Sequence, residues 1–156
     1  MRFEQEVLIW PRNDLERELP GAYLEGTLRI IVGDTRFFED IGILLIEFAE
    51  VAHRWLLECR REPCSLYYVS MDFEEEPILA FCYDVATETF ALQSVWAEAE
   101  LEPLPRDTVI TAVASYVDAL RDQLAATPDI DFEALLAKAE TMERSCFSPP
   151  TDAFTR

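Results

Sequence analysis

The chain has 156 residues, of which 50% are apolar and 12% aromatic, and its 31 acidic and 13 basic groups give a net charge of -18. This apolar content is enough to build a core, which excludes an intrinsically disordered acidic chain. The negative charge disfavours binding to nucleic acids and anionic membranes. It indicates either a surface for a basic partner or a general adaptation for solubility or habitat, and the composition leaves both open.

Two observations predict a cytoplasmic protein. No apolar run reaches the roughly 18 to 20 residues of a membrane span, and residues 1–10 carry two glutamates where a signal peptide would be basic. The four cysteines, Cys59, Cys64, Cys82 and Cys146, follow no disulfide framework, so we expect reduced thiols.

The N-terminal part is predicted to form strands over residues 3–10 and 23–32. Gly33 and Asp34 then form a two-residue turn into a further strand over residues 35–38, because glycine accepts the positive φ that such a turn requires.

A central helix is predicted next, over residues 41–60, with Asp40 as its N-terminal cap and Pro63 beyond its end. Its polar residues recur at three- and four-residue steps and form one narrow stripe: Glu47, Glu50, Arg54, Glu58 and Arg61. Since nearly all other positions are apolar, we expect this helix to be buried on more than one side.

A three-strand meander follows, over residues 66–73, 78–85 and 89–96. Pairing Val85 with Phe90 and Tyr83 with Leu92 places the apolar residues on one face of the sheet. The opposite, half-exposed face is expected to carry Tyr68, Ser70, Asp72, Cys82, Asp84 and Gln93.

The remaining chain contains an acidic, proline-punctuated connector over residues 97–106 and two helices. The first helix covers residues 107–124, Asp131 caps the second, and residues 148–156 are predicted to be a flexible tail. The whole pattern predicts a single α+β domain over residues 1–147. An N-terminal hairpin and a three-strand meander form an antiparallel sheet, which packs on the central helix and two C-terminal helices.

Catalysis has little support in the sequence, and we predict no catalytic residue, no metal and no cofactor. His53 is the only histidine, so a nucleophilic pair or a zinc site with Cys59 and Cys64 lacks its remaining members. Four glycines provide no phosphate-binding loop. Asp72 and Asp84 on one sheet face leave a carboxylate-based or metal-assisted enzyme as an alternative.

Acidic residues concentrate in two places, the turn at residues 74–76 and the connector. They predict a binding surface for a basic protein, with an aromatic anchor among carboxylates. The expected members are Asp72, Glu74, Glu75, Glu76, Asp84, Glu98, Glu100, Glu102 and the anchor Tyr68. Trp96 is either a second anchor or part of the core.

The central helix, the segment S-M-D-F-E-E-E-P-I-L-A-F, the strand end Val95-Trp96 and the following amphipathic helix together resemble bacterial polymorphic-toxin immunity proteins. The resemblance covers about residues 22–125. It implies a non-enzymatic inhibitor that blocks a cognate toxin, often a basic nuclease. A phage-type nucleic-acid mimic that inhibits a host defence system, and a subunit that oligomerises through its aromatic residues, remain alternatives.

Overall fold

The computed structural model describes residues 1–70, 73–127 and 129–141 and begins with a three-stranded antiparallel sheet. Its strands lie in the order β1 (Arg2–Ile9), β2 (Glu25–Val32) and β3 (Thr35–Leu44). All three predicted strands are present, and Gly33 takes a φ of 58° in the turn between β2 and β3. A short helix, α1 (Asp14–Glu18), and a 3-10 turn (Pro20–Ala22) lie between β1 and β2, where a loop was expected.

The predicted start of the central helix is wrong by four residues. Residues 41–44 continue β3, and the helix α2 (Leu45–Arg61) begins directly at the strand end without a loop. Gly42 explains the difference, since it adopts a φ of 104° at a bulge where Ile41 and Ile43 face consecutive residues of β2. Glycine weakens a helix and permits a bulge, so the ladder with β2 persists. Asp40 consequently lies in β3 and caps nothing.

Helix α2 is the central element that the sequence predicts. Ten of its 17 residues are buried, including Arg54 from the polar stripe. Glu62 follows its last residue and donates a backbone hydrogen bond to Glu58, so the helix stops just before Pro63.

The second half of the chain forms a separate four-stranded antiparallel sheet. Its strands are β4 (Leu66–Tyr68), β5 (Leu79–Asp84), β6 (Thr89–Gln93) and β7 (Leu104–Pro105), in that order. The predicted pairing is shifted by two residues, because Tyr83 faces Phe90 and Phe81 faces Leu92. A shift of two keeps each side chain on its predicted face. It also leaves Val85 outside the ladder and 80% exposed.

Tyr68 lies on the inner face of this sheet, contrary to prediction. It faces Leu79 in the ladder, just as Leu66 faces Phe81, so these four side chains share one face. Tyr68 is fully buried, its ring centroid lies 5.0 Å from that of Phe48, and its hydroxyl donates a 2.9 Å hydrogen bond to Glu47.

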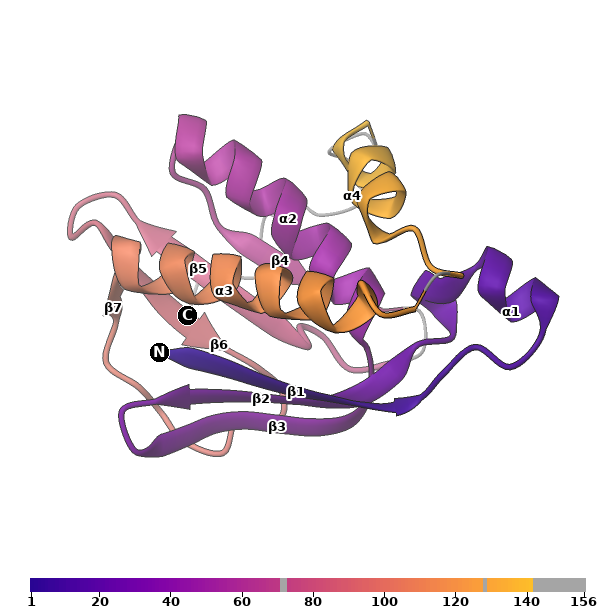
Figure 1. Cartoon of the computed structure of the whole chain (residues 1–156). Coiled ribbons are helices and arrows are strands. Elements are labelled where there is room, and N and C mark those ends of the chain that lie inside the picture. The colour runs from indigo at the N-terminus through magenta and orange to yellow at the C-terminus, as the bar shows by residue number, and fades with distance from the viewer. Residues whose placement is uncertain (71–72, 128, 142–156) are drawn as a thin grey trace.

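Two further helices complete the α+β fold, which is the predicted class. They are α3 (Arg106–Leu124) and α4 (Phe132–Glu140), and the Asp131 side chain caps α4 by accepting from the Ala134 N–H at 2.9 Å. Helices α2 and α3 lie side by side above β1–β3, and α4 contacts α2 (Figure 1). No helix in the described ranges has the length and apolarity to cross a bilayer. The predicted tail at residues 148–156 lies outside the described residues.

An aromatic cluster joins the two halves of the chain around Phe48 of α2. The ring centroid of Phe48 lies 6.1 Å from Phe3 of β1, 5.0 Å from Tyr68 of β4 and 5.1 Å from Tyr116 of α3. The Tyr116 hydroxyl is buried and donates a 2.8 Å hydrogen bond to the carbonyl of Leu45. This bond fixes α3 against the first turn of α2.

We predict that Gly26→Ala destabilises the fold strongly, because a Cβ atom there would lie 2.2 Å from the carbonyl oxygen of Glu6 and 2.5 Å from Leu45 Cδ1. The strand backbone of β1 would have to shift, so the free energy of unfolding should fall by about 3 kcal/mol. Denaturant titration measures this. Gly21→Ala is the matched control, since its Cβ meets nothing closer than 3.7 Å. Equal losses in the two variants would contradict the close approach at Gly26.

We predict that Asp40→Asn stabilises the protein at about pH 7. Asp40 Oδ2 is buried without a hydrogen-bond partner among the described residues, and loss of hydration raises the pKa of this carboxyl group. When the pKa of a carboxyl group is higher in the folded than in the unfolded state, the free energy of unfolding falls as the pH rises from the unfolded-state pKa through the folded-state pKa. Calorimetry should therefore show a higher Tm for the variant at neutral pH and a difference that vanishes near pH 3. Asp34→Asn, at the exposed turn, should show no comparable pattern; a lower neutral Tm for Asp40→Asn would refute the desolvation argument.

Candidate functional site

The predicted acidic turn is fixed in place by Trp96. The indole Nε1–H donates a 2.7 Å hydrogen bond to Glu75 Oε2, and the ring packs edge-on against Phe73 with centroids 4.8 Å apart. The indole also stacks on Phe38 of β3, with ring centroids 6.4 Å apart. Trp96 is thus half-buried, with its N–H bound to Glu75 and its ring in contact with two phenylalanines.

The connector after Trp96 bridges the two sheets. The Val95 N–H donates to the carbonyl of Pro77 at 3.1 Å, and the Glu98 N–H donates to the carbonyl of Phe37 at 2.8 Å. These bonds bring the start of the connector next to the acidic turn on the one hand and to β3 on the other. The glutamates of both segments are exposed, and together we call them the acidic edge: Glu74, Glu75, Glu76, Glu98, Glu100 and Glu102.

Arginine side chains compensate one part of the acidic edge. Glu98 forms a 2.8 Å ion pair with Arg36, which also reaches Glu39 at 2.5 Å, and Glu39 accepts from Arg29 at 2.6 Å. The hydrogen bond to Glu98, with the charges of Glu39 and Glu98, raises the pKa of Arg36. Within the described ranges, the carboxylates of Glu74, Glu76, Glu100 and Glu102 have no ion pair, so the negative potential concentrates on them.

Two predicted members, Asp84 and Tyr68, do not belong to this surface, and a third, Asp72, lies outside the described residues. Asp84 ends β5 at the opposite end of that strand from the acidic turn. Its carboxylate accepts from the Ala86 N–H at 2.8 Å and the Thr87 hydroxyl at 3.0 Å, and these bonds lower the pKa of Asp84. It therefore stabilises the β5–β6 hairpin. Tyr68 is buried, so its prediction as an anchor is wrong.

The residues considered for catalysis or metal binding are placed apart from the acidic edge. His53 Nε2 lies 2.9 Å from Glu140 Oε1 and joins α2 to α4. Cys59 and Cys64 lie at the C-terminal end of α2, away from His53 by more than one helical turn. Among the described residues, no group of three or more His, Cys, Asp or Glu side chains is arranged to hold a metal ion.

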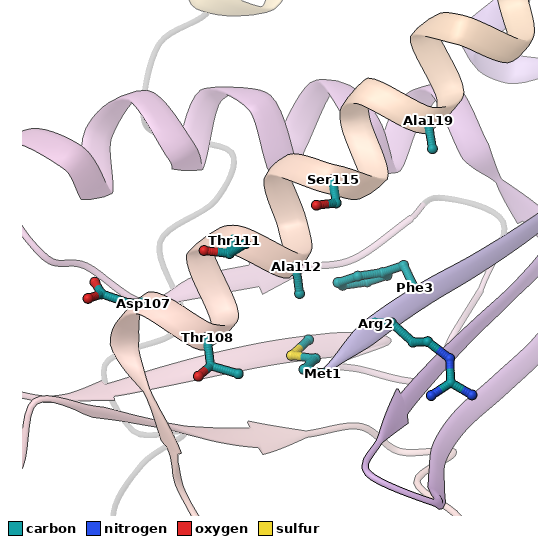
Figure 2. A pocket seen from close by; sticks show the side chains of 9 residues that line it. All are labelled: Met1, Arg2, Phe3, Asp107, Thr108, Thr111, Ala112, Ser115 and Ala119. Atoms are coloured by element: carbon teal, nitrogen blue, oxygen red, sulfur yellow. The ribbon is translucent and has the colours of Figure 1, made fainter.

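A hollow of about 610 Å³ between β1 and α3 was not predicted from the sequence. Figure 2 shows it between the first residues of β1 and one side of α3. The side chains that line it are Met1, Arg2, Phe3, Asp107, Thr108, Thr111, Ala112, Ser115 and Ala119. The small residues Ala112, Ser115 and Ala119 recur at helical spacing and leave this space open. This spacing of small residues is visible in the sequence and could have predicted the hollow. Hydroxyl and methyl groups of α3 make up much of the lining, with the charged side chains of Asp107 and Arg2 also present.

Residues 8–126 match a family described as a domain of unknown function, DUF7878. The match covers more than half of the chain, so the chain belongs to this family. The matched range contains α2, the acidic edge and α3. No curated protein and no solved structure matches the chain.

We predict that the Trp96 indole holds the acidic turn in one ordered conformation. Trp96→Phe keeps the ring contacts with Phe73 and Phe38 but removes the donor to Glu75, which should cost about 0.5–1.5 kcal/mol. Amide hydrogen exchange at residues 73–76 should become faster, while exchange in α2 stays unchanged. Trp10→Phe, at a side chain that is 39% exposed, is the control. Unchanged exchange at the turn in Trp96→Phe would show that the indole does not fasten it.

Proposed function

We propose that this member of the DUF7878 family is a non-enzymatic inhibitor of the immunity type, which acts in the cytoplasm and blocks a basic protein such as a toxin nuclease. The single observation that carries the proposal is the acidic edge itself, a set of exposed glutamates held around the half-buried Trp96. The resemblance to immunity proteins supports the same class of partner.

Electrostatics make this surface suited to rapid capture of a basic partner. Five of its six carboxylates, all but that of Glu98, have no ion pair in the described part of the chain, and the net charge of -18 adds a long-range attraction. Such steering raises association rates by orders of magnitude at low ionic strength and weakens as salt screens it beyond about 10 Å. Speed of capture is what an inhibitor of a toxic enzyme requires.

Preorganisation supports affinity as well as speed. The turn is bound to Trp96 through Glu75, and the backbone on either side of Trp96 is bound to Pro77 through Val95 and to Phe37 through Glu98. A surface that is already ordered loses little conformational entropy on binding. Trp96 adds a partly exposed aromatic at the centre of the charged set, the kind of residue that often dominates binding energy at interfaces.

One feature favours an inhibitor of the immunity type over the alternative of a nucleic-acid mimic. Arg36 and Arg29 lie beside Glu98 and Glu39 at one end of the acidic edge. A mimic of nucleic acid presents repeated, uncompensated negative charges like the phosphates of a backbone. Mixed charge at one end instead suits a protein surface that pairs acidic residues with these arginines.

The test is capture of a partner from the native host by three immobilised forms of the full chain. The forms are the wild type, Glu74→Lys/Glu100→Lys, and the control Glu18→Lys/Asp122→Lys. All four substituted residues are exposed. Glu75 is left intact because it binds Trp96. The control residues lie in α1 and near the C-terminal end of α3, and Figure 1 shows α1 at the opposite end of the molecule from β7.

We expect the wild type and the control to retain the same basic protein at low salt and the acidic-edge variant to lose it. The two variants change the net charge equally, so a general charge effect would weaken both alike. The affinity for the recovered protein should fall at least tenfold in the acidic-edge variant and should decrease with salt. Retention by the acidic-edge variant that equals the wild type, or a retained partner that is not basic, would overturn the proposal.

A further inference from the structure

Two cysteines at the C-terminal end of α2 form a pair of hydrogen-bonded thiols. Cys59 lies in the last turn of the helix, and Cys64 follows the helix end and precedes β4. Their side chains are hydrogen-bonded to each other. Cys59 is fully buried, whereas Cys64 is partly exposed, so one sulfur of the pair lies toward solvent and the other toward the core.

The backbone of each cysteine is held by a side chain from elsewhere in the fold. The Trp55 indole N–H donates to the carbonyl of Cys64 at 2.9 Å, and Arg106 Nη2 donates to the carbonyl of Cys59 at 2.9 Å. Arg106 also interacts with the Cys59 side chain, while its buried Nε has no oxygen or nitrogen acceptor among the described residues. The positive charge of the guanidinium therefore stabilises a negative charge on the sulfur pair.

The electrostatic environment separates this pair from the other described cysteine. The hydrogen bond from Cys64, with a smaller contribution from the Arg106 charge, lowers the pKa of Cys59 to about 6 although burial opposes it. Burial alone raises the pKa of Cys82 to about 11. These opposite shifts favour a thiolate in the pair and a thiol at Cys82, and the thiolate is the reactive form of cysteine.

We propose that Cys59 and Cys64 are a dithiol that hydrogen peroxide oxidises to an intramolecular disulfide, which a thiol reductant converts back to the dithiol. Transfer of the shared proton from Cys64 to Cys59 places the negative charge on the partly exposed Cys64, which peroxide reaches from solvent. The Cys64 thiolate attacks one peroxide oxygen, an S–O bond forms, the O–O bond breaks, and hydroxide leaves and is protonated to water. Cys59 then attacks the Cys64 sulfenic sulfur, an S–S bond forms, and the S–O bond breaks with loss of a second water. The two thiols lose two electrons and two protons, and one peroxide becomes two waters.

Trypsin gives a direct readout, because Arg60 and Arg61 lie between the two cysteines. The full chain, carrying Cys146→Ser to remove the thiol outside the described residues, is treated with hydrogen peroxide. It is then blocked with N-ethylmaleimide and digested. We expect the peptide that ends at Arg60 to be joined to the peptide that contains Cys64, and to separate on addition of dithiothreitol. Fragmentation should locate the bond at Cys64 and find Cys82 alkylated.

Three variants keep the result specific. Cys64→Ser should abolish the cross-link, and Cys82→Ser should leave its rate unchanged. Arg106→Gln should slow formation of the disulfide several-fold at about pH 6.5 and move the pH profile of the rate upward, because the thiolate loses its cation. Arg106→Lys, which retains the charge, should restore part of the rate.

Oxidation of Cys59 or Cys64 to sulfinic acid without a cross-link would overturn the proposal. So would reaction at Cys82 as fast as at the pair, or a bond from Cys59 to Cys82. A pH profile that is the same in the wild type and Arg106→Gln would remove the guanidinium from the mechanism.

Discussion

The burial of α2 organises this molecule, because every other large element contacts that helix or rests on one that does. Each fully buried aliphatic or aromatic side chain contributes about 1.5–3 kcal/mol relative to exposure, and ten residues of α2 are buried. Among the described residues, no strand of one sheet pairs with a strand of the other. The two sheets are held in one fold through Phe48, Tyr68 and Tyr116 around the helix. The acidic edge depends on the same core, because Trp96 rests on Phe38 from one sheet and on Phe73 beside the other.

Basic residues are few, and many of them are used at the joints between elements. Arg36 binds the connector to β3, Arg121 binds α4 to α3 through Glu133, and Arg106 binds α3 to the end of α2. Arg17 reaches Asp129 at 3.7 Å and so brings α1 toward the segment before α4. Exposed ion pairs contribute little stability each. Because the arginines lie at these joints, many acidic residues elsewhere on the described surface have no basic partner beside them. The negative potential therefore gathers on surfaces such as the acidic edge.

The sequence predicted those parts of the fold that depend on local periodicity. Helices α2, α3 and α4 repeat apolar residues at helical spacing, and the Asp131 cap is a neighbour of the helix that it caps. The errors arose where distant contacts decide. The side of the sheet on which Tyr68 lies depends on its pairing with Leu79, and a strand of three residues is too short to reveal that by alternation. The proximity of the acidic turn and the connector was expected because both lie on or beside the meander, but the hydrogen bond from Trp96 to Glu75 was not. The placement of Arg106 against Cys59 has no sequence signal, because it results from packing α3 on α2.

The direct passage from β3 into α2 also limits how sequences of this fold can vary. With no loop between Leu44 and Leu45, one residue inserted there would rotate the helix by about 100° relative to the strand. Phe48 would then leave the aromatic cluster, and polar residues would enter the core. Insertions and deletions are instead expected between β1 and β2, because no residue of the intervening helix α1 is buried. Related sequences should therefore differ in length between β1 and β2, while the number of residues from the β2–β3 turn to Phe48 stays constant.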